Sequence, residues 1–515
     1  MDQTLAHTWN RDRTAKRIDD ALEAVETVEI VDYTRDASLE NIPVNRAYRM
    51  RGAHLYADIV NLDDMLAVTD IEGETCHRRT LRFLNLHYRA VHRILNRVDA
   101  RRVDFHNQRL HAVFAKPYGA TSSDIASRIH RAVATAQLII NVLAETGDDD
   151  ENIPNAKVRV GIDSGIAMAV NNGRRGGREP LFLGTPANTA AKFAGASTKT
   201  GIFLTNNARK FIGLDEVDRP KSTALTPGEV GLSQQAAGLG VNEDEIVEEW
   251  RKDLDVNPIG AFEFKRHTPP LKNMDIPSLT PGNSRRQESA SIYADLDGFS
   301  AYVAGKIKDD ETAKDVVRVL HVLRSEMDSA LSVDFGGRRI RFIGDCLHGL
   351  ICEGTAYTTD EEATVSNATL CAGAIRSSFD LAIEKLKGEG IDVDGLGIQI
   401  GFELGPISTT RLGMQGDRVR CSIARAVRNA EQEQLRCAAG ETAVGQAAYD
   451  AGTDAVRELF QNDRKAIDLD YNEAVEALAA AGDETAKASK KAALAVAAPA
   501  VHRASETVIR PHAAD

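Results

Sequence analysis

Several features that would place a protein in a membrane or outside the cell are missing from this sequence. Its 515 residues contain no apolar run of about 18 residues or more, and the first residues, Met1 to Thr4, do not begin a signal-peptide pattern. Its six cysteines show no Cys-x-x-Cys spacing. We therefore expect reduced thiols, no association with a membrane and a cytoplasmic location.

An excess of positive charge is missing as well. The chain has 63 lysines and arginines against 76 aspartates and glutamates, which gives a formal net charge of -13 at pH 7. Proteins that neutralise many nucleic-acid phosphates usually need a basic field. We therefore expect no nucleic-acid partner, and any phosphate-binding site must be a local one.

What the sequence does contain is one motif in two copies. Tyr-Ala-Asp ends an apolar run at Asp58 and again at Asp295. A second landmark lies about fifty residues later, at Gln108 in the first copy and at Asp345 in the second. Both pairs of landmarks are 237 positions apart. A register that holds over two landmarks indicates an internal duplication.

The two copies also share one order of secondary structure. The first copy predicts a strand at 54–60, a helix at 75–97, a hairpin at 102–115, a helix at 122–145 and a strand pair at 157–170 broken at Gly165. The second copy predicts a strand at 291–296, a helix at 312–331, a hairpin at 338–351, a helix at 364–385 and a strand at 397–409. This β-α-β-β-α-β order is typical of ferredoxin-like α+β domains.

The expected organisation is therefore two α+β domains in tandem. The predicted boundaries are an N-terminal arm over 1–45, a first domain over 46–215, a loop, last strand and linker over 216–285, a second domain over 286–465 and an alanine-rich tail over 466–515. Within the connecting segment, the Gly/Ser/Gln stretch from Thr226 to Gly240 suits a mobile loop. Gly260 to Arg266 predicts the last strand of the first domain.

The second copy places two aspartates where a metal site is plausible on chemical grounds. Asp295 ends a strand, and Asp345 follows Gly344 in a hairpin turn. Two carboxylates brought together repel unless a cation lies between them, so the pattern favours two Mg²⁺ or Mn²⁺ ions. The protein ligands would be Asp295, Asp345 and the carbonyl oxygen of Leu296. The alternative is purely structural, because Gly-Asp is a common hairpin turn.

These segments resemble the class III nucleotidyl cyclases, the family of adenylate and guanylate cyclases. The resemblance covers roughly 50–215 and 288–450, and it rests on Asp295 to Ser300, Arg341 to Asp345, Gly161 to Gly165, Gly401 to Pro406 and Gly184 to Lys192. The last of these is similar to the helix that carries the family's ribose-positioning Asn and its transition-state Arg. It implies catalytic roles for Asn188 and Lys192, although a lysine lacks the bidentate fork of an arginine.

In this family the catalytic dimer forms head to tail, with the metals from one half and the Asn/Arg pair from the other. The resemblance therefore implies a pseudo-two-fold intramolecular dimer with one competent site. Asp295 and Asp345 of the second copy would face Asn188 and Lys192 of the first. The two polar residues of the first copy share one helix face, because they are four positions apart.

The opposite site is expected to be inert. With Ala424 aligned to Ala190, its residues are Asp58, Gln108, Ser422 and Ala426. A shift of a few residues would instead bring Arg425 or Arg428 into the place of the catalytic helix pair.

The resemblance also identifies the positions that read the base. They fall at Asp104, where adenylate cyclases usually have lysine and guanylate cyclases glutamate, and at Leu181. A carboxylate accepts hydrogen bonds, so Asp104 suits the N3–H of uracil, the amino group of cytosine or adenine, or the donors of guanine. Duplicated cyclases with such a pocket resemble the bacterial pyrimidine cyclases of the Pycsar anti-phage systems. Alternatively, Asp104 points to solvent beside Arg101 and Arg102.

Two segments are candidates for binding the triphosphate. Lys265 or Arg266 follows the predicted last strand of the first domain, where the family places a phosphate-binding lysine. The glycine-rich basic loop from Gly173 to Arg178 could approach an anion with its backbone, but a solvated hairpin tip is the favoured interpretation.

The expected activity is attack of the ribose 3′ oxygen of a nucleoside triphosphate, UTP before CTP, on its α-phosphate, with release of pyrophosphate. The product would be a second messenger in anti-phage defence, read by a separate effector protein, and the chains can associate as a homodimer. The alternatives are an adenylate or guanylate cyclase, a catalytically silent nucleotide sensor and a polymerase-like palm domain.

Overall fold

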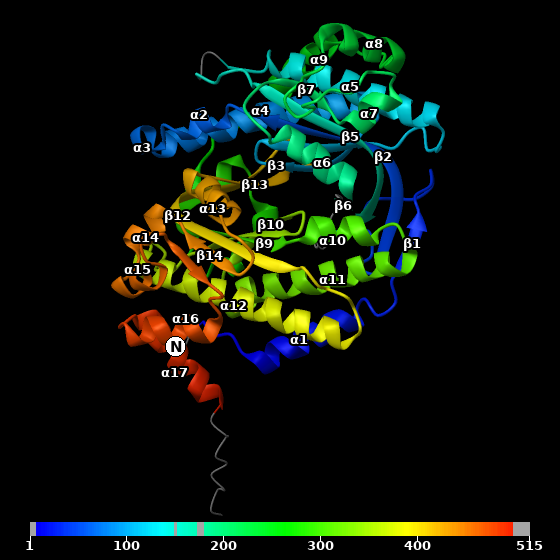
Figure 1. Ribbon diagram of the computed structural model, residues 1–515. Coiled ribbons are helices and arrows are strands. Elements are labelled where there is room, and N and C mark those ends of the chain that lie inside the picture. Colours follow the sequence, from blue (N-terminus) through cyan, green and yellow to red (C-terminus); the bar gives the residue numbers. More distant parts are fainter. Residues whose placement is uncertain (1–6, 149–151, 172–179, 498–515) are drawn as a thin grey trace, which may run out of the picture.

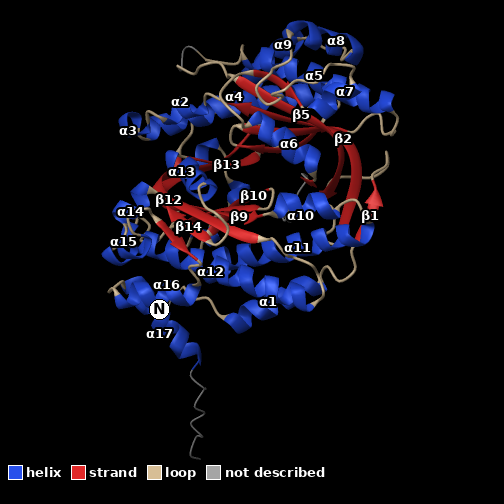
Figure 2. Cartoon of the chain, viewed as in Figure 1, coloured by secondary structure: helices blue, strands red, loops and turns tan. Residues whose placement is uncertain are grey.

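The computed structural model describes residues 7–148, 152–171 and 180–497. The basic loop from Gly173 to Arg178 lies outside these residues. Each repeat forms one mixed sheet covered by helices, and the two sheets face each other with α6 and α13 between them (Figures 1 and 2). None of the helices that the structure describes combines the length and the apolar character that a bilayer-spanning helix needs.

The sheet of the first repeat has the strand order β3-β4-β2-β5-β6, with β1 beside β2 and β7 beside β5. Its centre is the antiparallel pair β2 (Arg46–Ile59) and β5 (Val158–Val170). The predicted break at Gly165 is wrong, because Gly165 pairs with Gly52 inside a continuous strand. The other strands are β1 (Glu29–Asp32), β3 (Arg101–His106), β4 (Arg109–Phe114), β6 (Leu181–Leu183) and β7 (Gly201–Leu204).

The helices predicted for the first repeat are confirmed as α4 (Glu74–Arg97) and α5 (Ser122–Leu143). Their apolar residues join those of β2 and β5 in one core, and Thr121 and Asp124 cap the start of α5 reciprocally. The shorter helices are α2 (Leu62–Leu66), α3 (Thr69–Glu72), α6 (Thr185–Ala194) and α7 (Asn206–Phe211).

The sheet of the second repeat has the order β10-β11-β9-β12-β14-β15, with β13 beside β12 and β8 beside β9. Its centre is again a long antiparallel pair, β9 (Ser284–Asp297) and β12 (Gly397–Leu412). The other strands are β8 (Phe264–Lys265), β10 (Arg338–Ile343), β11 (Cys346–Ile351), β13 (Val419–Ile423), β14 (Glu441–Val444) and β15 (Lys465–Ile467).

The helices predicted for the second repeat are confirmed as α11 (Asp310–Ser329) and α12 (Glu361–Gly388). A π-helical turn over Ala330–Asp334 follows α11. The remaining helices, two of them in the alanine-rich tail, are α10 (Phe299–Lys306), α13 (Arg425–Leu435), α14 (Gln446–Ala451), α15 (Asp454–Phe460), α16 (Tyr471–Ala480) and α17 (Glu484–Ala497).

The mobile loop predicted after the first domain is wrong. The segment forms α8 (Pro227–Ala237), and α9 (Glu243–Val256) follows it. Trp250 on α9 is buried, and its indole N–H donates to the carbonyl of Leu86 on α4 at 3.1 Å. The two helices thus extend the helical layer of the first repeat.

The strand predicted to close the first domain is also misplaced. Only Phe264 and Lys265 are extended, and they pair in parallel with Ser284 and Arg285 of β9 in the second sheet. β1 pairs in the same way with the start of β2 in the first sheet. Each repeat is therefore preceded by a short parallel edge strand, and β8 belongs to the second repeat.

The two repeats pack directly against each other along a polar seam. Asp104 and Arg341, which are equivalent residues 237 positions apart, form an ion pair across it at 3.1 Å. Arg102 donates two hydrogen bonds of 2.8 Å to the carboxylate of Asp417. Contact between equivalent positions is what an approximate two-fold relation between the repeats produces, and such bidentate pairs fix orientation as well as distance.

The predicted N-terminal arm contains α1 (Arg11–Glu23), which packs on α11 and α12 of the second repeat. Arg17 donates to Glu326 at 3.1 Å and to both oxygens of Asp334 at 2.9 Å. Both carboxyls are almost completely buried, with exposed side-chain fractions of 3% and 0%. Burial raises the pKa of Glu326 to about 7, although Arg17 opposes this shift.

Replacing Arg17 with methionine should destabilise the protein by about 3–5 kcal/mol, because the buried carboxyl of Glu326 loses its cation. Asp334 loses one of two, since Arg13 also pairs with it at 2.8 Å. Since the folded pKa of Glu326 lies above its ordinary value of 4.5, the folded state retains a proton that the unfolded state releases, and stability falls as pH rises between these values. Without Arg17 that pKa rises further, so the stability deficit should be largest above pH 7 and smaller at pH 5.

Urea unfolding at the two pH values measures this effect. Arg11→Met is the matched control, because Arg11 on the same helix pairs with Glu384 at the surface, with exposed fractions of 60% and 64%. It should change stability by less than about 1 kcal/mol at either pH. An Arg17→Met deficit that is small, or equal at both pH values, would contradict the assigned role.

Candidate functional site

The two predicted metal carboxylates meet beside the end of β9. Asp295 lies near the end of this strand, and Asp345 lies in the turn between β10 and β11, where Gly344 adopts a left-handed φ of 64°. Burial raises the pKa of Asp345 to about 6. The pKa of Asp295 lies well above its ordinary range, first because of burial and second because of repulsion by Asp345. Arg324 opposes the shift of Asp345 without offsetting it, so the pair remains short of positive charge.

The equivalent place in the first repeat has an internal cation instead. Arg109 donates to Asp58 at 2.7 Å, and Gln108 replaces the second aspartate. The residue equivalent to Arg109 is Cys346, and burial raises the pKa of its thiol so far that it remains neutral. Among the described residues, Asp58 thus has an arginine partner, whereas no lysine or arginine pairs with Asp295.

This donor set fits divalent ions that prefer oxygen ligands. Asp295 and Asp345 supply two carboxylates, and Leu296 directly follows the first of them in β9. Among the residues that the structure describes, no group of three or more His, Cys, Asp or Glu side chains is placed to hold a metal ion. Mg²⁺ commonly binds to one or two carboxylates and takes its other ligands from substrate phosphates and water.

The helix of the first repeat reaches the metal half of the second repeat. Asn188 on α6 donates from its side-chain amide to the hydroxyl of Ser300 at 3.0 Å. Ser300 lies in the first turn of α10, five residues after Asp295. Lys192, one turn further along α6, is exposed and has no partner among the described residues. The contact joins α6 of the first repeat to the first turn of α10, the helix that follows β9 and Asp295 in the second repeat.

The two predicted base-reading residues line one small cavity of about 80 Å³. Asp104 and Leu181 of the first repeat face Ile343 and Gly344, which immediately precede Asp345 in the second. Asp104 does not point to solvent beside its neighbouring arginines, because Arg341 holds its carboxylate across the seam. The cavity is thus shared by both repeats and adjoins the metal hairpin.

The structure does not bring Lys265 and Arg266 to this cavity. Their strand pairs with the beginning of β9, whereas Asp295 lies near its end. Arg266 donates to the hydroxyl of Thr359 at 2.7 Å within the second repeat. A two-residue strand carries no periodicity, so its sequence gives no information about its partner.

The alignment used for the opposite site is wrong by six residues. Strands β6 and β13 end at the N-caps of α6 and α13, which are Gly184 and Ala424. Counting from these caps gives the equivalent residues directly. The equivalent pairs are Asn188 with Arg428 and Lys192 with Gln432.

Ser422 and Ala426 therefore do not occupy the places of the catalytic pair. Ser422 lies in β13 opposite Thr409, and Ala426 is the second residue of α13. The alternative shift that brings in Arg428 is the one that the structure supports. The apparent match of Ala424 to Ala190 misled the alignment, because alanine is common at helix starts and carries little register information.

Ion pairs close the opposite site. Arg428 binds Asp63 at 2.6 Å, in a contact equivalent to that of Asn188 with Ser300. The cavity between this pair and Gln108 measures only about 20 Å³. It is about a quarter of the volume of the cavity beside Asp104.

Sequence reasoning missed one residue that lines the base cavity, Arg324 on α11. It belongs to no recognised motif. The only available signal was an arginine inside an apolar helical stripe, between Leu320 and Met327, which are both buried. Arg324 itself is 4% exposed, and the positive end of its side chain lies over the ring of Phe342 at 4.0 Å.

Comparisons with known proteins agree with this geometry. No protein-family model matches the chain. A protein named uridylate cyclase from Pseudomonas aeruginosa is 60% identical over 508 residues, which cover 99% of this chain and 98% of that protein. A second protein named uridylate cyclase, from a Rhizobium species, is 39% identical over 436 residues, or 82% of each chain.

A solved structure is similar over most of the chain. It is described as a class III adenylyl cyclase-like ATP-binding protein from Pseudomonas aeruginosa. Its sequence is 62% identical, the TM-score is 0.90, and the match covers 92% of this chain and 100% of the other. The predicted α+β fold with two tandem class III cyclase domains is thereby confirmed. The chain belongs to the class III nucleotide cyclase family, within its uridylate cyclase group.

Proposed function

We propose that this chain converts UTP to 3′,5′-cyclic UMP and pyrophosphate at one site built by both repeats. The observation that carries the proposal is the contact of Asn188 with Ser300, which joins α6 of the first repeat to the start of α10, five residues after Asp295 in the second. The names of the curated relatives support a pyrimidine substrate. Asp104 supports it through its ability to accept from the N3–H of uracil.

Each half contributes a different part of the chemistry. Asp295, Asp345 and the carbonyl of Leu296 would hold two Mg²⁺ or Mn²⁺ ions, which supply charge neutralisation at the phosphates and a more acidic 3′ hydroxyl when they are bound. Asn188 orients the ribose, so that its 3′ oxygen lies in line with the α-phosphate. Lys192 offers a positive charge to the phosphate as its negative charge grows. Such positioning and charge stabilisation account for most of the rate in phosphoryl transfer.

We also propose the cellular role that the likeness to Pycsar pyrimidine cyclases implies. Cyclic UMP would act in the cytoplasm as a second messenger of anti-phage defence, and a separate effector protein would bind it. Chains can associate further as homodimers without sharing residues, because both halves of the site lie in one chain.

The purified protein with Mn²⁺ should release pyrophosphate from UTP and form cyclic UMP. CTP, GTP and ATP should react at least about tenfold more slowly, since a misplaced hydrogen-bond partner costs about 1–3 kcal/mol. Chromatography of the products of four parallel reactions measures this. ATP is the decisive competitor, because the solved relative is described as ATP-binding. Preferred formation of cyclic AMP would make the chain an adenylate cyclase.

Asn188→Ala and Asp345→Asn should each lower kcat by at least about a hundredfold, although the two residues lie in different repeats. A mixture of the two variants should remain inactive, since each chain then lacks one half of its own site. Product formation by the mixture would show that two chains share the site. Full activity of either variant would contradict the cross-seam arrangement.

Mn²⁺ binding without nucleotide separates the two strand-end carboxylates. Asp295→Asn and Asp345→Asn should each weaken Mn²⁺ binding by about tenfold or more, because a ligand charge is lost. Asp58→Asn is the matched control at the equivalent position, where Arg109 already neutralises the carboxylate. Calorimetric titration should give the wild-type affinity for this control. Equal losses in all three variants would place the metal elsewhere.

A further inference from the structure

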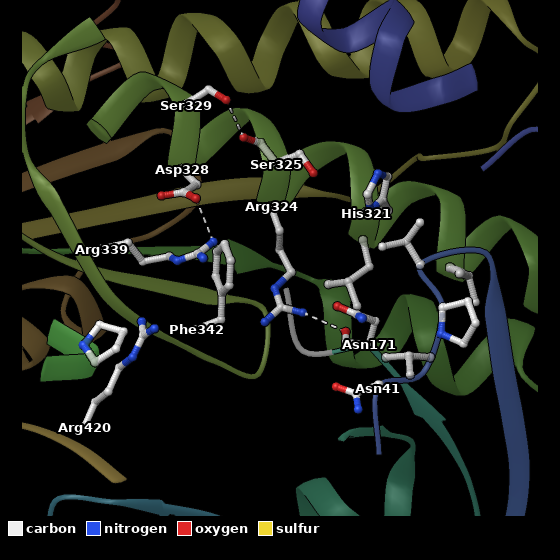
Figure 3. Close-up of a pocket in the computed structure, with 16 residues that line it drawn as sticks. Asn41, Asn171, His321, Arg324, Ser325, Asp328, Ser329, Arg339, Phe342 and Arg420 are labelled. Carbon is white, nitrogen blue, oxygen red and sulfur yellow. Dashed lines mark hydrogen bonds and ion pairs between the residues drawn. The ribbon is translucent and has the colours of Figure 1, made fainter. Parts of the chain in front are cut away.

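Arg324 connects the base cavity to a larger cavity of about 810 Å³ at the edge of the second sheet. It projects from α11 toward the first repeat, where its guanidinium donates to the carbonyl of Asn171 at 3.4 Å. The ring of Phe342 lies between Arg324 and Arg339, as Figure 3 shows, with centroid distances of 4.0 and 4.6 Å. Stacking on Phe342 limits the positions that the guanidinium can take.

The arginine is specific to the repeat that holds the metal carboxylates. The equivalent residue of the first repeat, 237 positions earlier, is His87. Its ring contacts the carbonyl of Phe83, and burial lowers its pKa to about 4, so that it is neutral. Burying a guanidinium costs far more than burying a neutral imidazole. If this helix position only had to pack, a neutral residue would be enough, because the first repeat folds with the neutral His87 there.

Arg324 and Asp104 present opposite hydrogen-bonding groups to one cavity. A guanidinium only donates, whereas a carboxylate only accepts. Asp104 already accepts from the backbone N–H of Phe105 at 2.8 Å and from Arg341 at 3.1 and 3.3 Å. Two carboxylate oxygens have about four acceptor positions in total, so one remains for a ligand.

A donor beside an acceptor distinguishes the bases by the order of groups on their edges. Uracil presents a carbonyl oxygen next to N3–H. Cytosine and adenine present the reverse order, an amino group next to an unprotonated ring nitrogen, so each would meet a like group. Guanine has the same order as uracil, so the donor and acceptor pair by itself does not distinguish these two bases.

We propose that Arg324 is a specificity-determining residue that donates a hydrogen bond to the uracil carbonyl adjacent to the N3–H accepted by Asp104. The inference rests on the proposed UTP cyclase activity and assigns one edge of its base to a residue from the second repeat. Recognition of the base is then divided between the repeats, as the catalytic groups are. Asn188 and Asp295 do not line the cavity that holds Arg324 and Asp104, whereas Gly344, the neighbour of Asp345, does.

The test compares UTP with 2-thio-UTP and 4-thio-UTP, in which sulfur, a weaker acceptor, replaces one carbonyl oxygen. The wild-type kcat/KM for one analogue should be about tenfold or more below that for UTP. In Arg324→Met, kcat/KM for UTP should fall by about tenfold to a hundredfold, while that for this analogue changes by less than about threefold. The discrimination between oxygen and sulfur would then be largely lost.

Two further variants separate recognition from packing. Arg339→Met removes the other arginine on Phe342, which lines the large cavity but not the base cavity, and it should keep the wild-type discrimination. Arg324→Lys retains a donor without the planar fork, and its discrimination should lie between those of wild type and Arg324→Met. The Arg324→Lys variant also allows the discrimination to be measured if Arg324→Met does not fold.

Unchanged discrimination against both analogues in Arg324→Lys and in any folded Arg324→Met would overturn the inference, even if overall activity falls. An equal loss of discrimination in Arg339→Met would overturn it as well, because the effect would then come from the packing of Phe342. If wild-type protein does not cyclise UTP, the proposed function fails, and the inference fails with it. If the protein cyclises UTP but the variants keep the wild-type discrimination, only the proposed role of Arg324 fails, and the proposed function stands.

Discussion

Each repeat has a carboxylate near the end of its central strand, Asp58 in the first and Asp295 in the second. How the charge of this carboxylate is compensated is the constraint on which the arrangement of both repeats depends. In the first repeat, Arg109 compensates Asp58 at 2.7 Å. In the second, the neutral thiol of Cys346 occupies the place of the arginine, and Asp345 adds a second negative charge. A buried pair of like charges without a cation is costly. A single position, arginine or cysteine, thus decides which repeat has a protein cation beside its strand-end carboxylate.

The choice at that position separates the roles of the repeats. On α6 of the first repeat, Asn188 contacts Ser300, while on α13 of the second repeat Arg428 binds Asp63. These two contacts are equivalent across the seam, but only one leaves an amide beside a pair of carboxylates. The opposite site is closed by charge pairs, so it contributes to the association of the repeats. Divergence of a duplicated domain has therefore turned one of two equivalent clefts into a structural contact.

The sequence predicted what periodicity and register encode, and it failed where these signals are weak. Helices α4 and α12 carry long buried stripes, and the spacing of 237 residues identified the repeats. α8 was missed because its composition is rich in glycine, serine and glutamine, although Thr226 and Glu229 form a capping box that the sequence could have revealed. The error at Ser422 arose because the spacing of equivalent residues changes from 237 to 240 before β12: Asp58 and Asp295 are equivalent, and they pair with Arg159 and Gln399. The match of Ala424 to Ala190 assumed a spacing of 234 instead.

The meeting of Asp295 and Asp345 was predictable because strand ends and hairpin turns are local, whereas the cavity beside Asp104 depends on contacts between distant segments. Asp104 was identified by resemblance, but its orientation is set by Arg341, which no local pattern connects to it. Arg324 reaches the same cavity from the middle of a helix, where an apolar side chain would be expected from periodicity. A charged residue that interrupts a buried stripe has to find compensation across the seam. Such interruptions, rather than family motifs, are where the specificity of a duplicated cyclase can change without disturbing the residues that perform its chemistry.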